Sequence, residues 1–216
     1  MAVKTIADLE QALDESMAWR RIELHALRGE IAKAEKNFPG RPLTRVLARS
    51  GVAILYAHWE GYVKDSCQTY VDYVARRRLL YRELNDGFLA VSVSALLKRL
   101  DSGNDAAKSD LIDLIRRPEN ARAKVPKNHI VDTKSNLRSS VLCEILSSIG
   151  FAVDKFDTSR NLIDLSLCDA RNSIAHGRDH YPTPGSFEDL HAEVLELMER
   201  IHGLIIEAAR LRTYRV

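Results

Sequence analysis

The chain has 216 residues, a hydrophobic content of 45% and a formal net charge of +2 at pH 7. This content is enough to bury a core, and the length suits one large domain or a helical core with an insertion. The longest apolar run, Val52 to Ala57, is too short to cross a bilayer, and the N-terminus lacks a signal-peptide pattern. We therefore expect a soluble, cytoplasmic protein without membrane contact, with a single helical domain over residues 1–216.

The first part of the chain is predicted to form two long helices. Apolar residues recur at helical spacing from about residue 5 to 36, and the segment Pro39 to Pro42 then breaks the pattern. A second helix is expected from about residue 43 to 81. Its middle is apolar on every side, which is typical of the central helix of a bundle. Trp59 is expected in the core, and the tyrosines of this helix, Tyr56 among them, are expected to pack along it.

The remaining elements are also predicted to be helical. Shorter helices are expected at about 88–100 and 105–116, followed by a basic loop over about 117–136. Residues 132–136 offer candidate N-caps for a helix over 137–149. A further helix runs from about residue 158 through residue 176, and the last one spans about 186–211. Since no alternating run is long enough for a sheet, the fold class is predicted to be all-α.

The cysteines and histidines give no sign of a disulfide framework or a metal site. Cys67, Cys143 and Cys168 are widely spaced and form no CxxC pair, so we expect reduced thiols in the core or at an interface. His176 and His180 have a metal-compatible spacing, but no acidic third ligand has a clear position. No metal and no cofactor are therefore expected.

The segment 171–177, Arg-Asn-Ser-Ile-Ala-His-Gly, gathers residue types that suit phosphodiester chemistry. The guanidinium of Arg171 offers a planar set of donors to phosphate oxygens, and the imidazole of His176 can move protons near neutral pH. The amide of Asn172 can orient either group. The alternative is structural, because a histidine at a helix end stabilises the helix dipole and an arginine one turn earlier can form a salt bridge.

Helical geometry aligns these residues poorly within one chain. Asn172 and His176 are four residues apart and share a face, whereas Arg171 lies about 140° from His176 around an ideal helix. Three solutions remain: the arginine side chain curls round, the helix loosens at Gly177, or a second copy of the helix supplies the missing group.

The apolar residues of this helix favour the second copy. A core-facing stripe is predicted from Ile163, Leu167, Ala170 and Ile174. The opposite face, with Asn172 and His176, is expected to carry Leu165, Cys168 and Ala175 and is too apolar for a face that meets only water. We infer a partner surface, most simply in a symmetric homodimer.

Basic residues concentrate in two places, at residues 76–82 and between Arg116 and Arg138. They are either a solvated helix end and a polar loop, or a surface that tracks the phosphates of RNA. In the second case Arg178, Lys127 and Lys134 are the predicted substrate-binding residues.

His58 and Glu60 interrupt the most apolar helix, where a buried charge needs a partner or a task. Glu60 is expected either to pair with Lys64 in a structural network or, with His58, to support the site.

Four segments together resemble a known family: residues 55–64 (LYAHWEGYVK), 131–137 (VDTKSNL), 161–164 (NLID) and 171–177 (RNSIAHG). In this order and spacing they are similar to the MAE-type HEPN-like nucleases of the HEPN superfamily. Residues 13–27, with Trp19 and Arg20, also fit, so the resemblance covers almost the whole chain.

The resemblance implies a helical bundle that dimerises to form a composite, metal-independent ribonuclease site, commonly in a toxin or an abortive-infection effector. It places Arg171 and His176 in the catalytic pair and Asn172 beside them. RNA would be cut by its own 2′-hydroxyl, and a cognate antitoxin is a further expected partner. The alternatives are a non-catalytic HEPN module that binds nucleotides, RNA or a partner protein, and an antitoxin-like or scaffold protein.

Overall fold

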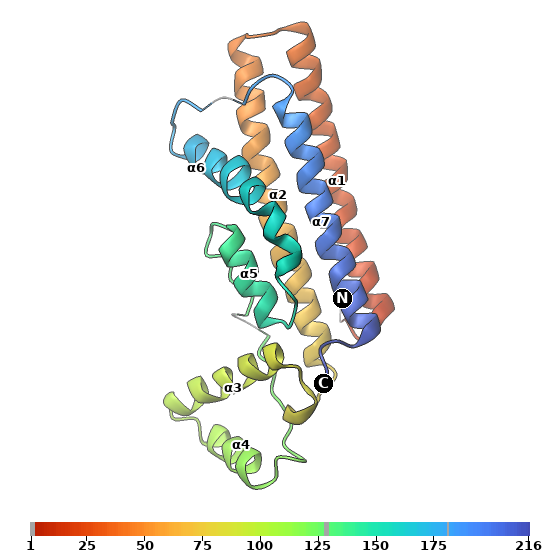
Figure 1. The fold of residues 1–216 in the computed structure, drawn as a ribbon, viewed down its shortest axis with the longest axis vertical. Helices are drawn as coiled ribbons and strands as arrows, with labels where there is room; N and C mark the ends of the chain where they lie inside the picture. Colours follow the sequence, from red (N-terminus) through yellow and green to blue (C-terminus); the bar gives the residue numbers. More distant parts are fainter. Residues whose placement is uncertain (1–2, 128–129, 181) are drawn as a thin grey trace.

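The computed structural model describes residues 3–127, 130–180 and 182–216, and these ranges form an all-α fold (Figure 1). No strand occurs within them, although two isolated bridges join Leu80 to Arg122 and Leu84 to Arg215. The predicted fold class is confirmed. The helices in chain order are α1 (Ile6–Asn37), α2 (Pro42–Ala75), η1 (Tyr81–Glu83), α3 (Asp86–Asp101), α4 (Asp105–Arg116), α5 (Ser139–Ser148), η2 (Asp154–Ser159), η3 (Leu162–Asp169), α6 (Ala170–Ala175) and α7 (Ser186–Leu211).

The three long helices α1, α2 and α7 pack along one another and form the body of the molecule (Figure 1). A capping box between Thr5 and Asp8 begins α1, and Pro42 occupies the first position of α2, where its missing N–H costs nothing. Trp59 and Tyr62 of α2 are completely buried. The prediction that the second helix is central is therefore confirmed.

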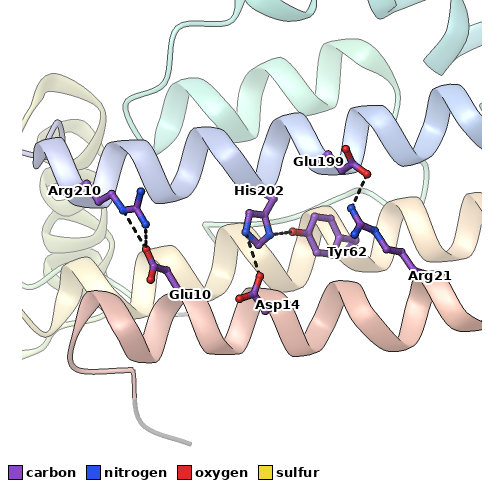
Figure 2. A network of polar contacts seen from close by, with 7 residues as sticks. All are labelled: Glu10, Asp14, Arg21, Tyr62, Glu199, His202 and Arg210. Carbon is purple, nitrogen blue, oxygen red and sulfur yellow. Dashed lines mark hydrogen bonds and ion pairs between the residues drawn. The ribbon is translucent and has the colours of Figure 1, made fainter.

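A polar network crosses the three long helices (Figure 2). The hydroxyl of Tyr62 lies 3.0 Å from Nδ1 of His202, and Nε2 of the same histidine lies 3.5 Å from Asp14 Oδ1. These two contacts join one residue from each of α1, α2 and α7 at the same level of the bundle. Two ion pairs at 2.5 Å flank it, one between Arg21 and Glu199 and one between Arg210 and Glu10.

Helices α3 and α4 form an arm at one end of the bundle (Figure 1). A small apolar cluster holds them together, built on Leu96 of α3, Ala107 of α4, Tyr81 of η1 and Ala121 after α4. The predicted basic loop leads back from α4 to α5, and its residues Asn128 and His129 lie outside the described ranges.

Two predicted boundaries are wrong. The helix expected to reach residue 81 ends at Ala75, because Arg78 adopts a left-handed φ of 51° and the next residues pair with the loop at Arg122. None of residues 132–136 caps α5. Its N-cap is Arg138, which makes no side-chain cap bond.

The helix predicted from residue 158 to 176 is divided into three pieces, the 3₁₀-helix η2, the π-helix η3 and the α-helix α6. A π-helix has more residues per turn than an α-helix, so faces assigned on an α-helical wheel shift along it. Cys168, expected on the partner face, is in fact completely buried. The core stripe is confirmed for Ile163, Leu167 and Ala170, which are buried, while Ile174 is half-buried.

All three cysteines are free, as expected, and Cys67 and Cys168 are buried. Burial raises the pKa of both buried thiols to about 12, so they are inert as nucleophiles. Within the described ranges, no helix is both long and apolar enough to cross a membrane.

Candidate functional site

Residues 171–177 lie on and just after the short helix α6, which follows directly on the π-helix η3. Arg171 is in the first turn of α6, and His176 is its C-cap residue. π-Helical stretches are rare and occur frequently at functional sites. The backbone thus changes its helical pitch immediately before the three candidate residues.

Gly177 ends α6 through a Schellman motif. Its φ of 69° lies in the left-handed region, where a residue without Cβ is unstrained. Its N–H donates to the carbonyl of Ile174 at 3.0 Å, and the N–H of Arg178 donates to that of Ser173 at 2.9 Å. This turn fixes the backbone that carries His176, whose side chain is exposed.

The side chain of Arg171 is held against α2. Its guanidinium carbon lies 4.0 Å from the ring centroid of Tyr56, and its Nη2 donates to the carbonyl of Ser135 at 2.9 Å. Tyr56 is only 2% exposed. Two contacts from different parts of the chain therefore set the position of this guanidinium.

The loop that supplies the Ser135 carbonyl is fixed from both sides. The N–H of Leu137 donates to the hydroxyl of Tyr56 at 2.7 Å, and the thiol of Cys168 donates to the carbonyl of Leu137 at 3.2 Å. Lys134 and Ser135 have φ values of 52° and 55°, a left-handed conformation that non-glycine residues rarely adopt. Such strain persists only where the surrounding contacts over-determine it, as they do here.

Asp164 joins η3 to the start of α5. Its carboxylate accepts from the backbone N–H of Ser139 at 2.7 Å and from the hydroxyl of the same residue at 2.6 Å. A carboxylate at a helix N-terminus satisfies an unpaired donor and matches the helix dipole. A second link, an ion pair between Arg138 and Asp169, lies beside it.

Three of the four segments singled out in the sequence therefore meet at Arg171. They contribute Tyr56, the pair Ser135 and Leu137, and Arg171 itself. The fourth contributes Asp164, which binds Ser139 two residues after Leu137. Sequence reasoning assigned Tyr56 only to packing along the second helix and gave Asp164 no role. Their membership of the resembling segments was the signal that could have identified them.

Asn172 is half-buried and His176 is exposed. In the described part of the chain, no hydrogen bond joins the side chains of Arg171, Asn172 and His176 to one another. The guanidinium is directed to α2, whereas the imidazole meets solvent. One chain thus presents these groups separately.

A family model described as RiboL-PSP-HEPN matches residues 15–207, a range that includes all four segments. The chain belongs to the RiboL-PSP-HEPN family. No curated protein and no solved structure matches the chain in the other two comparisons.

In this RiboL-PSP-HEPN chain, His58 lies on the side of α2 that faces α1. Its Nε2 is 3.2 Å from a carboxylate oxygen of Glu23, and its ring packs at 5.1 Å against Trp19. Burial lowers its pKa, an effect that Arg20 reinforces and Glu23 opposes. These contacts place His58 in the α1–α2 interface rather than beside Arg171.

Glu60 is four residues after Tyr56 and therefore lies on the same face of α2. Its Oε1 is buried without a hydrogen-bond partner, as are Nε of Arg171 and Oδ1 of Asn136. Burial raises the pKa of Tyr56, and the charge of Glu60 adds to this effect while the bond from the Leu137 amide opposes it. Glu60 thus borders the site of this HEPN chain, and no ion pair with Lys64 forms in the described ranges.

Of the basic residues predicted to bind substrate, Lys134 is nearest in sequence to the site, next to Ser135. Its ammonium pairs with Glu144 at 2.5 Å. The carbonyl of Lys127 accepts a hydrogen bond from the side chain of Gln68 at 2.5 Å. Gln68 is twelve residues after Tyr56 on α2, which corresponds to about 18 Å along the helix axis. Lys127 is therefore remote from Arg171 within one chain of this HEPN protein.

Arg178 is exposed just after α6, and its carbonyl accepts from Arg49 at 3.0 Å and from the N–H of His180 at 2.8 Å. Searched over the described ranges, the HEPN chain holds no group of three or more His, Cys, Asp or Glu residues that could bind a metal ion.

Proposed function

We propose that this HEPN chain is a metal-independent endoribonuclease whose active site is built on Arg171, Asn172 and His176. The observation that carries the proposal is that two other segments hold the guanidinium of Arg171, through Tyr56 and Ser135, in a chain of this family. Membership alone allows a nuclease or an RNA-binding module. The clamped guanidinium supports the nuclease, because a preorganised donor stabilises charge without reorganising at the moment of reaction.

The chemistry follows from the substrate and the side chains. The 2′-oxygen of RNA attacks the adjacent phosphorus as it loses its proton, the bond from phosphorus to the 5′-oxygen breaks, and that oxygen gains a proton. His176 exchanges one of these protons, Arg171 binds the non-bridging oxygens as their charge grows, and Asn172 holds the imidazole or the phosphate. The products are a 2′,3′-cyclic phosphate and a 5′-hydroxyl, and DNA, which lacks the nucleophile, is not cut.

The active unit in this proposal is a symmetric homodimer. His176 is exposed next to the exposed Ala175, and Leu165 on the preceding turns is 60% exposed. A second copy of α6 across this surface would cover Leu165 and add its own polar residues to one composite site. One helix aligns Arg171 poorly with His176, because the two residues are about 140° apart around it. In a dimer, the arginine of one chain can instead face the histidine of the other.

In the cell, the protein would act as a toxin or an abortive-infection effector of the MAE-type group and would be restrained by a cognate antitoxin. The basic residues Lys127, Lys134 and Arg178 would contact RNA phosphates. Dimerisation would change which of them lie near a given site.

The test is incubation of the purified protein with total RNA in EDTA, followed by analysis of the new ends. Wild type is expected to produce cyclic phosphate ends, and His176→Ala and Arg171→Ala are each expected to cut at least about a hundredfold more slowly. His180→Ala is the matched control, since His180 is a half-buried histidine four residues after His176 and its loss should leave activity intact. Equal cleavage by wild type and His176→Ala would refute the assignment.

One observation favours the alternative, a HEPN module that binds RNA, a nucleotide or a partner protein without cutting. The guanidinium of Arg171 already contacts Tyr56 and Ser135, which is also the behaviour of a structural arginine. That reading predicts intact RNA with every variant, together with binding that weakens as salt is added.

A further inference from the structure

Tyr56 is the residue of α2 that Arg171 rests on. The guanidinium carbon lies 4.0 Å from its ring centroid, a distance at which the ring face attracts a cation. The ring is 2% exposed and cannot turn away without disturbing the core around α2. It therefore offers the guanidinium a rigid surface rather than a mobile contact.

A second contact of Tyr56 fixes the other support of the same guanidinium. The Tyr56 hydroxyl accepts from the N–H of Leu137 at 2.7 Å, two residues after the Ser135 carbonyl that accepts from Nη2 of Arg171 at 2.9 Å. One side chain thus orients the arginine directly through its ring and indirectly through its hydroxyl. The ring face and the carbonyl together restrict both the plane and the rotation of the guanidinium.

Terminal N–H groups of Arg171 are left for a ligand. Its Nε is buried without a partner, its Nη2 donates to the Ser135 carbonyl, and a side-chain hydrogen bond from Arg171 lowers the pKa of Tyr56. A guanidinium has five N–H groups, so terminal N–H groups outside these contacts can still donate to a phosphate. An arginine held in this way loses less conformational entropy when it binds a phosphate than a freely rotating one does.

We propose that Tyr56 is a positioning residue for Arg171, which it orients so that the terminal N–H groups of the guanidinium meet the non-bridging oxygens of the scissile phosphate. This inference rests on the proposed ribonuclease function and adds to it a residue that acts only through the arginine. Loss of the ring face should lower kcat more than it raises KM, because the contact with the phosphate strengthens as charge develops.

The test compares Tyr56→Phe with Tyr56→Leu. Both variants remove the acceptor of the Leu137 N–H, and the leucine loses further stability because it leaves a cavity at this buried position. Only the phenylalanine keeps a ring face under Arg171. The expected kcat is within about threefold of wild type for Tyr56→Phe and about tenfold lower for Tyr56→Leu, with a small change in KM. Rates are measured well below the melting temperature of the least stable variant.

A matched control lies on the same helix. Tyr73 is also buried and also supports an arginine, Arg77, at 4.5 Å, but it is distant from α6. Tyr73→Leu should lose stability and retain kcat. In an Arg171→Ala background, Tyr56→Leu should lower kcat no further, since a residue that acts only through the arginine has no effect without it.

The outcomes separate this inference from the proposed function. Cleavage by wild type with equal kcat for Tyr56→Phe and Tyr56→Leu, or a further tenfold loss in the Arg171→Ala background, overturns the role of Tyr56 alone. Absence of cleavage by wild type overturns the ribonuclease and, with it, this role. The expected pattern of rescue by phenylalanine supports both.

Discussion

Lowering the pH from 7 to 4.5 should destabilise the folded chain through one residue, His191 of α7. This side chain is 1% exposed, and neither of its ring nitrogens has a hydrogen-bond partner. Its ring centroid lies 5.1 Å from that of His25 on α1 and 6.3 Å from that of Phe187. Burial lowers its pKa to about 4, and the positive charges of His25 and Arg28 add to the effect.

The sign and the size of the effect follow from this pKa. The unfolded chain takes up a proton at His191 near pH 6.5, whereas the folded chain stays neutral there until about pH 4. The neutral histidine thus contributes its full stability above pH 6.5, and that stability is lost as the pH falls through this window. Each pH unit between the pKa values of the unfolded and folded states corresponds to about 1.4 kcal/mol of unfolding free energy. At pH 4.5, within this interval, the loss of unfolding free energy is about 2 kcal/mol.

The assay is urea denaturation at pH 7 and pH 4.5 for wild type and His191→Leu. Carboxylates titrate in both wild type and His191→Leu. The difference between the two proteins in how the unfolding free energy changes with pH is therefore due to His191. Wild type should lose about 2 kcal/mol more than the variant between the two pH values. His180→Leu, at a half-buried histidine after α6, is the control and should follow wild type. Equal pH dependence for His191→Leu and wild type would refute the argument.

Three further predictions concern the site. Gly177→Ala places a Cβ at a φ of 69°, so it should cost about 1–2 kcal/mol in denaturant unfolding and also slow RNA cleavage by displacing the end of α6. Asp164→Ala leaves the N–H and the hydroxyl of Ser139 without their acceptor and should lower the unfolding free energy by about 2 kcal/mol, measured in the same way. Arg171→Lys keeps the charge but loses the planar donor set, so kcat should fall at least tenfold while the melting temperature changes little.

Local patterns were sufficient to predict most of the helices. The last helix begins at Ser186 and ends at Leu211 as expected, because Pro182, Pro184 and Gly185 precede it and its apolar residues keep one spacing throughout. Helix α4 likewise has its expected bounds. Both elements depend on residues close to one another in the chain, which is the information that a sequence pattern contains.

The errors occurred where distant residues decide the backbone. The bridge of Leu80 to Arg122 helps end α2 early, and Asp164 caps α5 in place of the neighbouring residues 132–136. The π-helix η3 shifted the faces of the segment before Arg171, so Cys168 is in the core instead of at a partner surface. No spacing rule for an α-helix could have placed it there.

The sequence by itself determined an all-α chain of this family and placed an arginine, an amide and a histidine within one short segment. Only the tertiary structure decided that Arg171 lies on the ring of Tyr56 and donates to Ser135, while His176 faces solvent. The physical reason is the range of the interactions. Helix propensity and periodicity act over a few residues, whereas the position of the guanidinium depends on how α2, the loop before α5 and α6 pack together.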